Sequence, residues 1–80
     1  MARVVWSEAA HGVLRELPID VQEAVAAKIR LLRRFPRMYQ MAGRGRFRRH
    51  RRFLVGEWLV YYRVVENTVY IRGLWPARIP

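Results

Sequence analysis

The stretch that decides the fold is Trp58-Leu59-Val60-Tyr61-Tyr62-Arg63-Val64-Val65. β-Branched and aromatic residues fill it, and these residue types are enriched in strands. Glu66-Asn67 follows as a two-residue turn, with the asparagine tolerating positive φ, and residues 68–74 form the last strand. Upstream, Gly56-Glu57 turns the chain, and strand character extends back over residues 47–55. Three hairpin-linked strands predict an antiparallel meander with one face free for helices.

The N-terminal half reads as a short strand, residues 3–6, followed by two helices. Ser7 is a good N-cap, and apolar residues then recur at helical spacing until Pro18 stops the first helix. The second helix begins at a cap-like pair, Asp20 and Glu23, and ends at Phe35-Pro36. The short proline-containing connection predicts an antiparallel helical hairpin. We therefore expect one α+β domain over residues 1–80, ordered β-α-α-β-β-β, with the hairpin packed on a small antiparallel sheet.

The composition is that of a globular and strongly basic chain. Hydrophobic residues make up 52% of the 80 residues, and the formal net charge is +10. Fifteen of the 16 basic residues are arginine, whose planar fork suits phosphate, although a GC-rich genome also enriches arginine. Without cysteine, and with His11 far from His50 in sequence, we expect no metal site and no cofactor. No apolar run reaches membrane-spanning length and no signal peptide is evident, so we expect a cytoplasmic protein.

The positive charge is concentrated just before the meander, where six of the nine residues from Arg44 to Arg52 are arginine. If this stretch is strand, alternation puts Arg46, Arg48, His50 and Arg52 on one face and Phe47, Arg49, Arg51 and Phe53 on the other. A rigid cationic surface on a small domain favours a polyanionic partner. The residues predicted to bind nucleic acid are Arg44, Arg46, Arg48, Arg49, Arg51 and Arg52.

The order of elements and several short motifs resemble the RelE/ParE superfamily of type II toxin–antitoxin toxins over nearly the whole chain. The most specific stretches are residues 55–64, similar to the family's glycine, aromatic and "(L/I)VYYRV" strand, and residues 69–72, similar to its "V-x-I-L-R" strand. Leu17-Pro18 and the helix end at Phe35-Pro36 also fit. Trp75-Pro76-Ala77-Arg78 looks like a variant of the family's "H-G-x-R" element.

The resemblance implies a toxin that a cognate antitoxin neutralises, and we expect that antitoxin to be acidic and encoded by the adjacent gene. RelE-like members cut messenger RNA in the ribosomal A site, whereas ParE-like members inhibit DNA gyrase. RNA cleavage by 2′-hydroxyl attack needs a base, cations beside the phosphorane and a proton for the leaving oxygen. The family's pattern places the catalytic group at His50, Arg48, Arg72 and Arg78.

His50, Arg72 and Arg78 also have a second interpretation, and so does Arg63 of the third strand. Arginines around His50 disfavour its cationic form, which suits a base and not an acid, but His50 could equally be a polar surface residue of a cationic strand. Arg72 and Arg78 are phosphate contacts, or partners in surface salt bridges and in ion pairs with an acidic antitoxin. Arg63 shares a face with Leu59, Tyr61 and Val65 and is a structural partner or a phosphate ligand.

Two departures from the RelE-like pattern bear on the mechanism. Leu59 stands where those toxins place an arginine after the aromatic residue of the third strand, and the sequence ends at Pro80 without a terminal tyrosine. Three hypotheses follow. The chain is a ribosome-dependent endoribonuclease, a gyrase inhibitor without nuclease activity, or a non-toxic relative that only binds nucleic acid. None of them requires a membrane.

Overall fold

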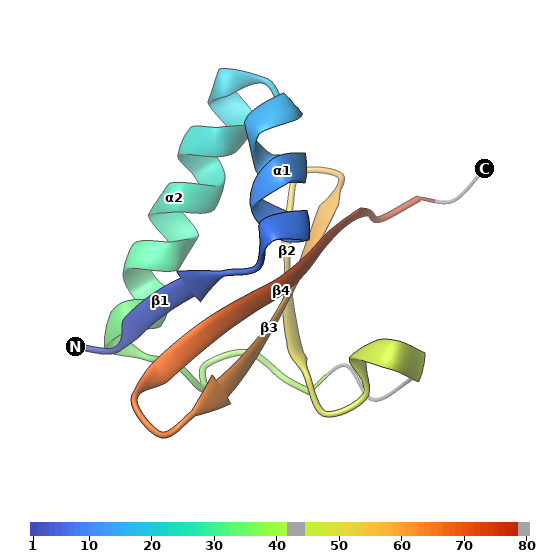
Figure 1. The fold of residues 1–80 in the computed structure, drawn as a ribbon. Coiled ribbons are helices and arrows are strands. Elements are labelled where there is room, and N and C mark those ends of the chain that lie inside the picture. Colours follow the sequence, from blue (N-terminus) through green and yellow to red (C-terminus); the bar gives the residue numbers. More distant parts are fainter. Residues whose placement is uncertain (42–44, 79–80) are drawn as a thin grey trace.

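The computed structural model of the protein describes residues 1–41 and 45–78 and confirms the expected order of elements (Figure 1). The described elements are β1 (Arg3–Trp6), α1 (Glu8–Glu16), α2 (Ile19–Arg34), the 3-10 helix η1 (Gly45–Phe47), β2 (Arg51–Val55), β3 (Trp58–Val65) and β4 (Thr68–Pro76). Two features of the architecture differ from the sequence prediction. η1 occupies the start of the expected second strand, and β1 lies parallel to its neighbour, which makes the sheet mixed and not antiparallel throughout. None of the helices in these two ranges is long and apolar enough to cross a membrane.

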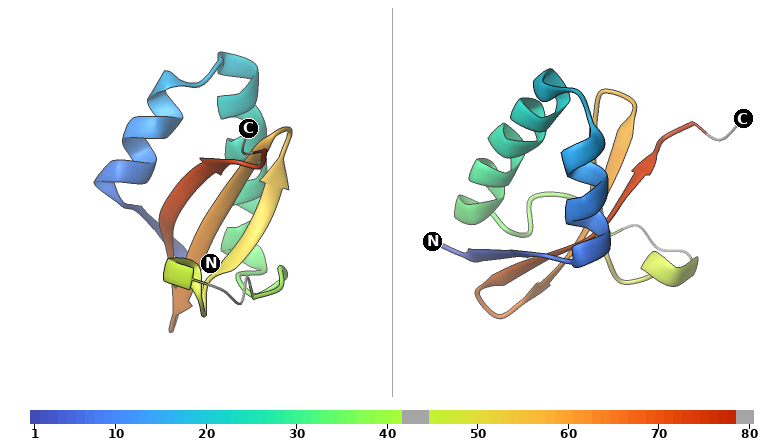
Figure 2. Two further views of the ribbon diagram at one scale, coloured as in Figure 1. Left: turned by 90° about the vertical axis from the view of Figure 1, so that its right-hand side faces the viewer. Right: turned by 45° about the horizontal axis from the view of Figure 1, so that its top comes forward.

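The four strands form one sheet in the order β1-β4-β3-β2. β2, β3 and β4 are the expected antiparallel meander, while β1 joins beside β4 in parallel. Both helices lie over one face of this sheet, with α1 against β4 and α2 against β1 and β2 (Figures 1 and 2). The other face carries neither α1 nor α2, and we call it the open face.

Local chemistry explains where the helices and turns begin. The Ser7 hydroxyl accepts a hydrogen bond from the Ala10 N–H at 3.1 Å, which confirms the predicted N-cap of α1. The predicted Asp20 cap of α2 is wrong, because the N-cap is Pro18 and Asp20 lies within the first turn. In the β3–β4 turn it is Glu66, and not Asn67, that has positive φ, at 54°.

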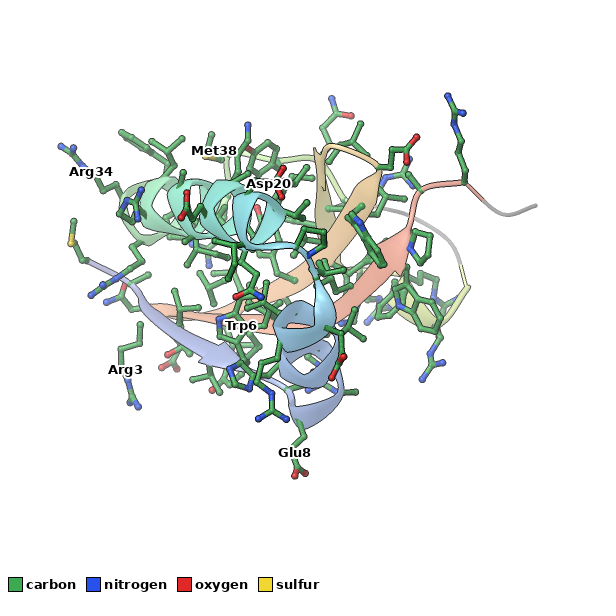
Figure 3. All side chains as sticks on the ribbon, turned by 90° about the horizontal axis from the view of Figure 1, so that it is seen from above. Arg3, Trp6, Glu8, Asp20, Arg34 and Met38 are labelled. Carbon is green, nitrogen blue, oxygen red and sulfur yellow. The ribbon has the colours of Figure 1, made fainter. Side chains whose placement is uncertain are left out.

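The core lies between the covered face of the sheet and the helices. Strand alternation sends Val60 and Tyr62 of β3 and Val69 and Ile71 of β4 into it, all fully buried. Val25 and Leu32 of α2 belong to the same core. Charged residues such as Arg3, Glu8 and Arg34 point away from the body of the molecule (Figure 3).

Among the buried core residues that the structure describes, Tyr62 alone has a side-chain polar atom. Its hydroxyl is buried and has no hydrogen-bond partner within residues 1–41 and 45–78. Burial raises the pKa of this hydroxyl to about 12, and the nearby Tyr39 backbone and Arg51 charge oppose the shift only in part. Tyr62 is therefore a neutral core residue.

Strands β3 and β4 change register between Tyr61 and Tyr62. Tyr62 pairs with Ile71 and Tyr61 pairs with Gly73, so Arg72 is an extra residue in β4. Such a β-bulge redirects a side chain and is common beside functional sites. Here it leaves Arg72 exposed and places Gly73 on the open face, opposite Tyr61.

Candidate functional site

Residues 45–50 form η1 and a turn, so the predicted strand alternation across this segment is wrong. The Arg48 N–H donates to the Gly45 carbonyl at 3.0 Å, and the His50 N–H donates to the Phe47 carbonyl at 2.9 Å. Arg49 has φ 72°, in the left-handed region. Alternation begins only at Arg51, where β2 starts. Arg46, Arg48, His50 and Arg52 are therefore not on one face of a strand.

Phe47 packs against the open face of the sheet and so holds residues 45–50 there. Its ring stacks on Tyr61 with centroids 4.3 Å apart and 10° between the planes, and meets Trp75 edge-on at 6.4 Å. The ring occupies the space above Gly73, where an added Cβ would lie 2.6 Å from the Phe47 Cζ atom. A glycine at position 73 is therefore what allows Phe47 to dock.

A cleft of about 680 Å³ lies between this docked segment and α1, along the last part of β4. It exists because β1 pairs with β4 only as far as Ile71, which leaves the following residues of β4 without a neighbouring strand on that side. Apolar and aromatic side chains form most of its wall, and Arg46, His50 and Arg72 contribute the polar groups. The lining residues are Ala9, Ala10, Val13, Arg46, Phe47, His50, Trp58, Arg72, Gly73, Leu74, Trp75 and Pro76.

The cleft is suited to an anion with an aromatic or apolar portion. Arg46 comes from η1 and Arg72 from the β4 bulge, and none of the chain's six acidic residues is in the lining. Guanidinium groups recognise phosphate oxygens, and exposed aromatic rings such as that of Trp75 offer a surface on which a base can stack.

His50 is held in a defined orientation at the edge of the cleft. Its Nδ1 lies 3.3 Å from the Arg48 carbonyl oxygen, and its ring packs edge-on against Phe47 at 5.5 Å. A carbonyl oxygen can only accept, so this hydrogen bond places the proton of a neutral ring on Nδ1 and leaves Nε2 as the acceptor. That is the tautomer which a general base at Nε2 requires.

The structure thus brings together His50 and Arg72 from the predicted catalytic group, joined by Arg46. Arg48 is exposed in the turn and contributes its carbonyl to His50, and Arg78 is exposed beyond β4 and does not line the cleft. Among the arginines predicted to bind nucleic acid, Arg52 is exposed on the open face, while Arg49 and Arg51 line a separate hollow. Arg44 lies outside the described residues.

The sequence prediction missed the aromatic wall of the cleft, made by Phe47, Trp58 and Trp75. The sequence contains one indication of this wall. A glycine inside a strand often marks a bulge or a close approach, and Gly73 lies beside a bulge and under the Phe47 ring. Within residues 1–41 and 45–78, no group of three or more histidine, cysteine or acidic side chains is placed to hold a metal ion.

The fold matches that of RelE-like toxins in two crystal structures. A chain of the intact E. coli RelBE toxin–antitoxin complex superposes with a TM-score of 0.84 at 16% identity, covering 99% of this chain and 100% of that chain. The isolated E. coli RelE toxin gives the same TM-score and identity, covering 100% of this chain and 88% of that chain. The molecule therefore has the RelE fold, with two helices on one face of a four-stranded sheet.

The sequence itself assigns the family. Residues 4–79 match the family model described as the ParE toxin of the type II toxin–antitoxin system parDE. The chain therefore belongs to the ParE toxin family, within the RelE/ParE superfamily that its motifs resemble, and an antitoxin is its partner. No protein with a curated description matches the sequence significantly.

Proposed function

We propose that this toxin blocks translation by cleaving messenger RNA on the ribosome, with the cleft as its active site. The observation that carries the proposal is the convergence of His50, Arg46 and Arg72 on one cleft with an aromatic wall. The reaction is attack of a ribose 2′-oxygen on the adjacent phosphorus. The new O2′–P bond forms, the P–O5′ bond breaks, and the 2′-hydroxyl proton goes to a base.

His50 Nε2 is the base in this proposal, because Nδ1 is engaged with the Arg48 carbonyl oxygen. Arg46 and Arg72 stabilise the additional negative charge on the phosphorane oxygens. The described lining of the cleft holds no second acid–base side chain, so solvent water supplies the proton that the leaving 5′-oxygen needs. Arg78 does not line the cleft, so any contact between Arg78 and RNA lies outside it.

The test is cleavage of messenger RNA by purified protein in translating ribosomes. His50→Ala is expected to lower the cleavage rate by roughly 10²- to 10⁴-fold, the usual contribution of a general base, while co-sedimentation with ribosomes is retained. His11→Ala is the matched control, since His11 is the other histidine and lies exposed on α1, outside the cleft. Intact message with the wild-type protein, or equal rates for the two variants, would refute the proposal.

The second candidate function is inhibition of DNA gyrase without nuclease activity. The match to a family model described as ParE toxin favours it, and so does Leu59 in place of the arginine expected in RelE-like nucleases. A supercoiling assay with gyrase distinguishes the two functions. Full supercoiling in the presence of excess toxin excludes this candidate.

We also infer that the antitoxin is acidic and encoded by the adjacent gene. The formal net charge of +10 favours a partner of opposite charge in either mechanism. Co-expression of the neighbouring reading frame followed by purification of a stable complex tests the inference. A neutral or basic partner in that complex would contradict it.

A further inference from the structure

A second cationic surface lies next to the cleft, and we call it the arginine hollow. It has a volume of about 420 Å³ and is lined by Arg37, Met41, Arg49, Arg51, Arg63 and Val64. Among the residues that the structure describes, the hollow and the cleft share no lining residue, although their residues are interleaved along the chain. Phe47 and His50 line the cleft, whereas Arg49 and Arg51 line the hollow.

The charge of the hollow is uncompensated within its lining. Four of its six lining residues are arginine, and none of the six acidic residues of the chain is among them. A concave surface of one sign with low-dielectric walls focuses the field and raises the local concentration of counter-ions. Such a surface is most stable with an anion bound, because the anion relieves the repulsion among the guanidinium groups.

Two backbone features hold the arginines in place. The Arg51 Nη1 donates to the Tyr39 carbonyl at 2.7 Å and is 3.4 Å from the Arg37 carbonyl, which ties the loop carrying Arg37 to the start of β2. Arg49 keeps a φ of 72°, a conformation that glycine adopts at lower cost. Strained positions of this kind concentrate at binding sites. The Arg51 side chain and the Arg49 backbone are therefore held in defined positions in the hollow.

We propose that the arginine hollow binds a second phosphate of the same single-stranded RNA whose cleavable bond lies in the cleft. The substrate would then be an extended strand that contacts both sides of residues 49–51, and this inference rests on the proposed function. RNA fits the hollow better than an acidic protein segment does, because Met41 and Val64 offer few apolar anchors of the kind that protein interfaces require. Arginine forks, in contrast, match phosphate geometry.

The main test compares two double variants that lose the same charge. Arg37→Gln with Arg63→Gln removes half of the hollow's arginines and spares Arg51, which supports the loop. Arg15→Gln with Arg30→Gln is the control, because both residues are exposed on the helices and line neither surface. Binding is measured by fluorescence anisotropy with an unstructured RNA of roughly 12 nucleotides, a length within the usual range of single-strand binding sites.

We expect the hollow variant to bind this RNA about tenfold or more weakly at low salt. Its salt dependence should be shallower by roughly 0.7 in the log–log slope for each phosphate that the protein no longer neutralises. The control variant should change affinity by no more than about twofold, the effect of general screening on distant charges. Equal losses in the two variants, no loss in the hollow variant, or no RNA binding by the wild-type protein would overturn the proposal.

Arg49→Gly provides a second variant whose result cannot come from unfolding. Glycine removes one guanidinium and also suits the positive φ of this position, so the melting temperature should stay the same or rise. RNA affinity should nevertheless fall by about threefold or more, because one charge-assisted hydrogen bond to phosphate is removed. A protein that keeps wild-type affinity would contradict a role for Arg49 in the hollow.

Two further outcomes separate this inference from its alternatives. If the hollow variant keeps RNA affinity but no longer binds the purified antitoxin, the hollow is a protein-binding surface and the proposal is overturned. If the wild-type protein leaves messenger RNA intact while the hollow variant still binds RNA weakly, the proposed function fails and the RNA site stands. If cleavage depends on His50 as expected while both double variants bind RNA equally, the proposed function stands and the RNA site fails.

Discussion

The two faces of the sheet use the same strands for different purposes. The covered face presents aliphatic side chains, Phe53 and Tyr62 to the helices, and its central residues Val60, Val69 and Ile71 are inaccessible to solvent. The open face carries Gly73, a stack of Phe47 on Tyr61, and exposed arginines such as Arg52. The stability of the protein therefore depends on close packing of the covered face. The cleft depends instead on the docking of Phe47 against the open face.

The largest effect on stability is expected from a cavity in the core beneath the helices. Leu32 of α2 is completely buried there. Leu32→Ala should lower the free energy of unfolding by about 3 kcal/mol, from lost apolar burial and the cavity left behind. Leu31→Ala on the same helix is the control, since Leu31 is 44% exposed and should cost less than about 1 kcal/mol. Urea denaturation measures both, and similar losses would show that the core is not where the structure places it.

A smaller effect is expected from breaking the open face at Gly73. An added methyl would lie 2.6 Å from Phe47 Cζ and 2.9 Å from Trp75 Nε1, so Gly73→Ala must displace both rings. We expect a loss of about 1–2 kcal/mol in stability, typical of overpacking, together with a changed near-ultraviolet circular dichroism spectrum.

Gly12→Ala is the matched control for this variant. Gly12 lies in α1 with nothing within 4 Å of an added Cβ, so the substitution should stabilise the protein by about 0.5–1 kcal/mol through helix propensity. If Gly73→Ala behaved in the same way and kept the wild-type spectrum, Phe47 would not be docked over position 73.

The smallest effect at neutral pH is expected from Tyr62→Phe, which sharpens the description of the covered face. Removing a buried hydroxyl without a partner should leave stability unchanged or raise it by up to about 1 kcal/mol. Loss of a hydroxyl group usually lowers the free energy of unfolding, so the change expected here has the opposite sign.

The same variant has a defined pH dependence. The pKa of Tyr62 is raised from 10.0 to about 12, so the unfolded chain ionises first and stability is lost as the pH rises from 10 towards 12. The wild-type protein should lose about 1.4 kcal/mol by pH 11 relative to Tyr62→Phe, at 1.36 kcal/mol per pKa unit. Parallel stability curves for the two proteins between about pH 8 and about pH 11, an interval that spans the ordinary tyrosine pKa, would contradict the burial of a neutral hydroxyl.

The regular part of the fold follows from local sequence patterns. Ser7, Pro18 and Gly56 mark the boundaries where propensity and backbone geometry leave few alternatives, and the strand period of residues 58–65 is strong enough to identify β3. The parallel placement of β1 beside β4 is different, because it depends on how the helices return the chain across the sheet. No local pattern in residues 3–6 contains that information.

The site was only partly predictable for a related reason. The family pattern pointed to His50 and Arg72, which line the same cleft. The strand pattern assigned to residues 47–50 was wrong because the segment closes on itself in η1 and a turn. Arginine has no strong preference between strand and turn, so a run of arginines carries little information about its own conformation. The docking of Phe47 over Gly73 is a tertiary contact and has no periodic signature.

The fit between Phe47 and Gly73 also constrains how this protein can change during evolution. A side chain at position 73 and an aromatic ring at position 47 compete for the same space. Lineages that replace the glycine are therefore expected to carry a smaller residue at position 47, and lineages that keep the ring are expected to keep the glycine. In an alignment of close relatives the two positions should vary together, although they are far apart in the sequence.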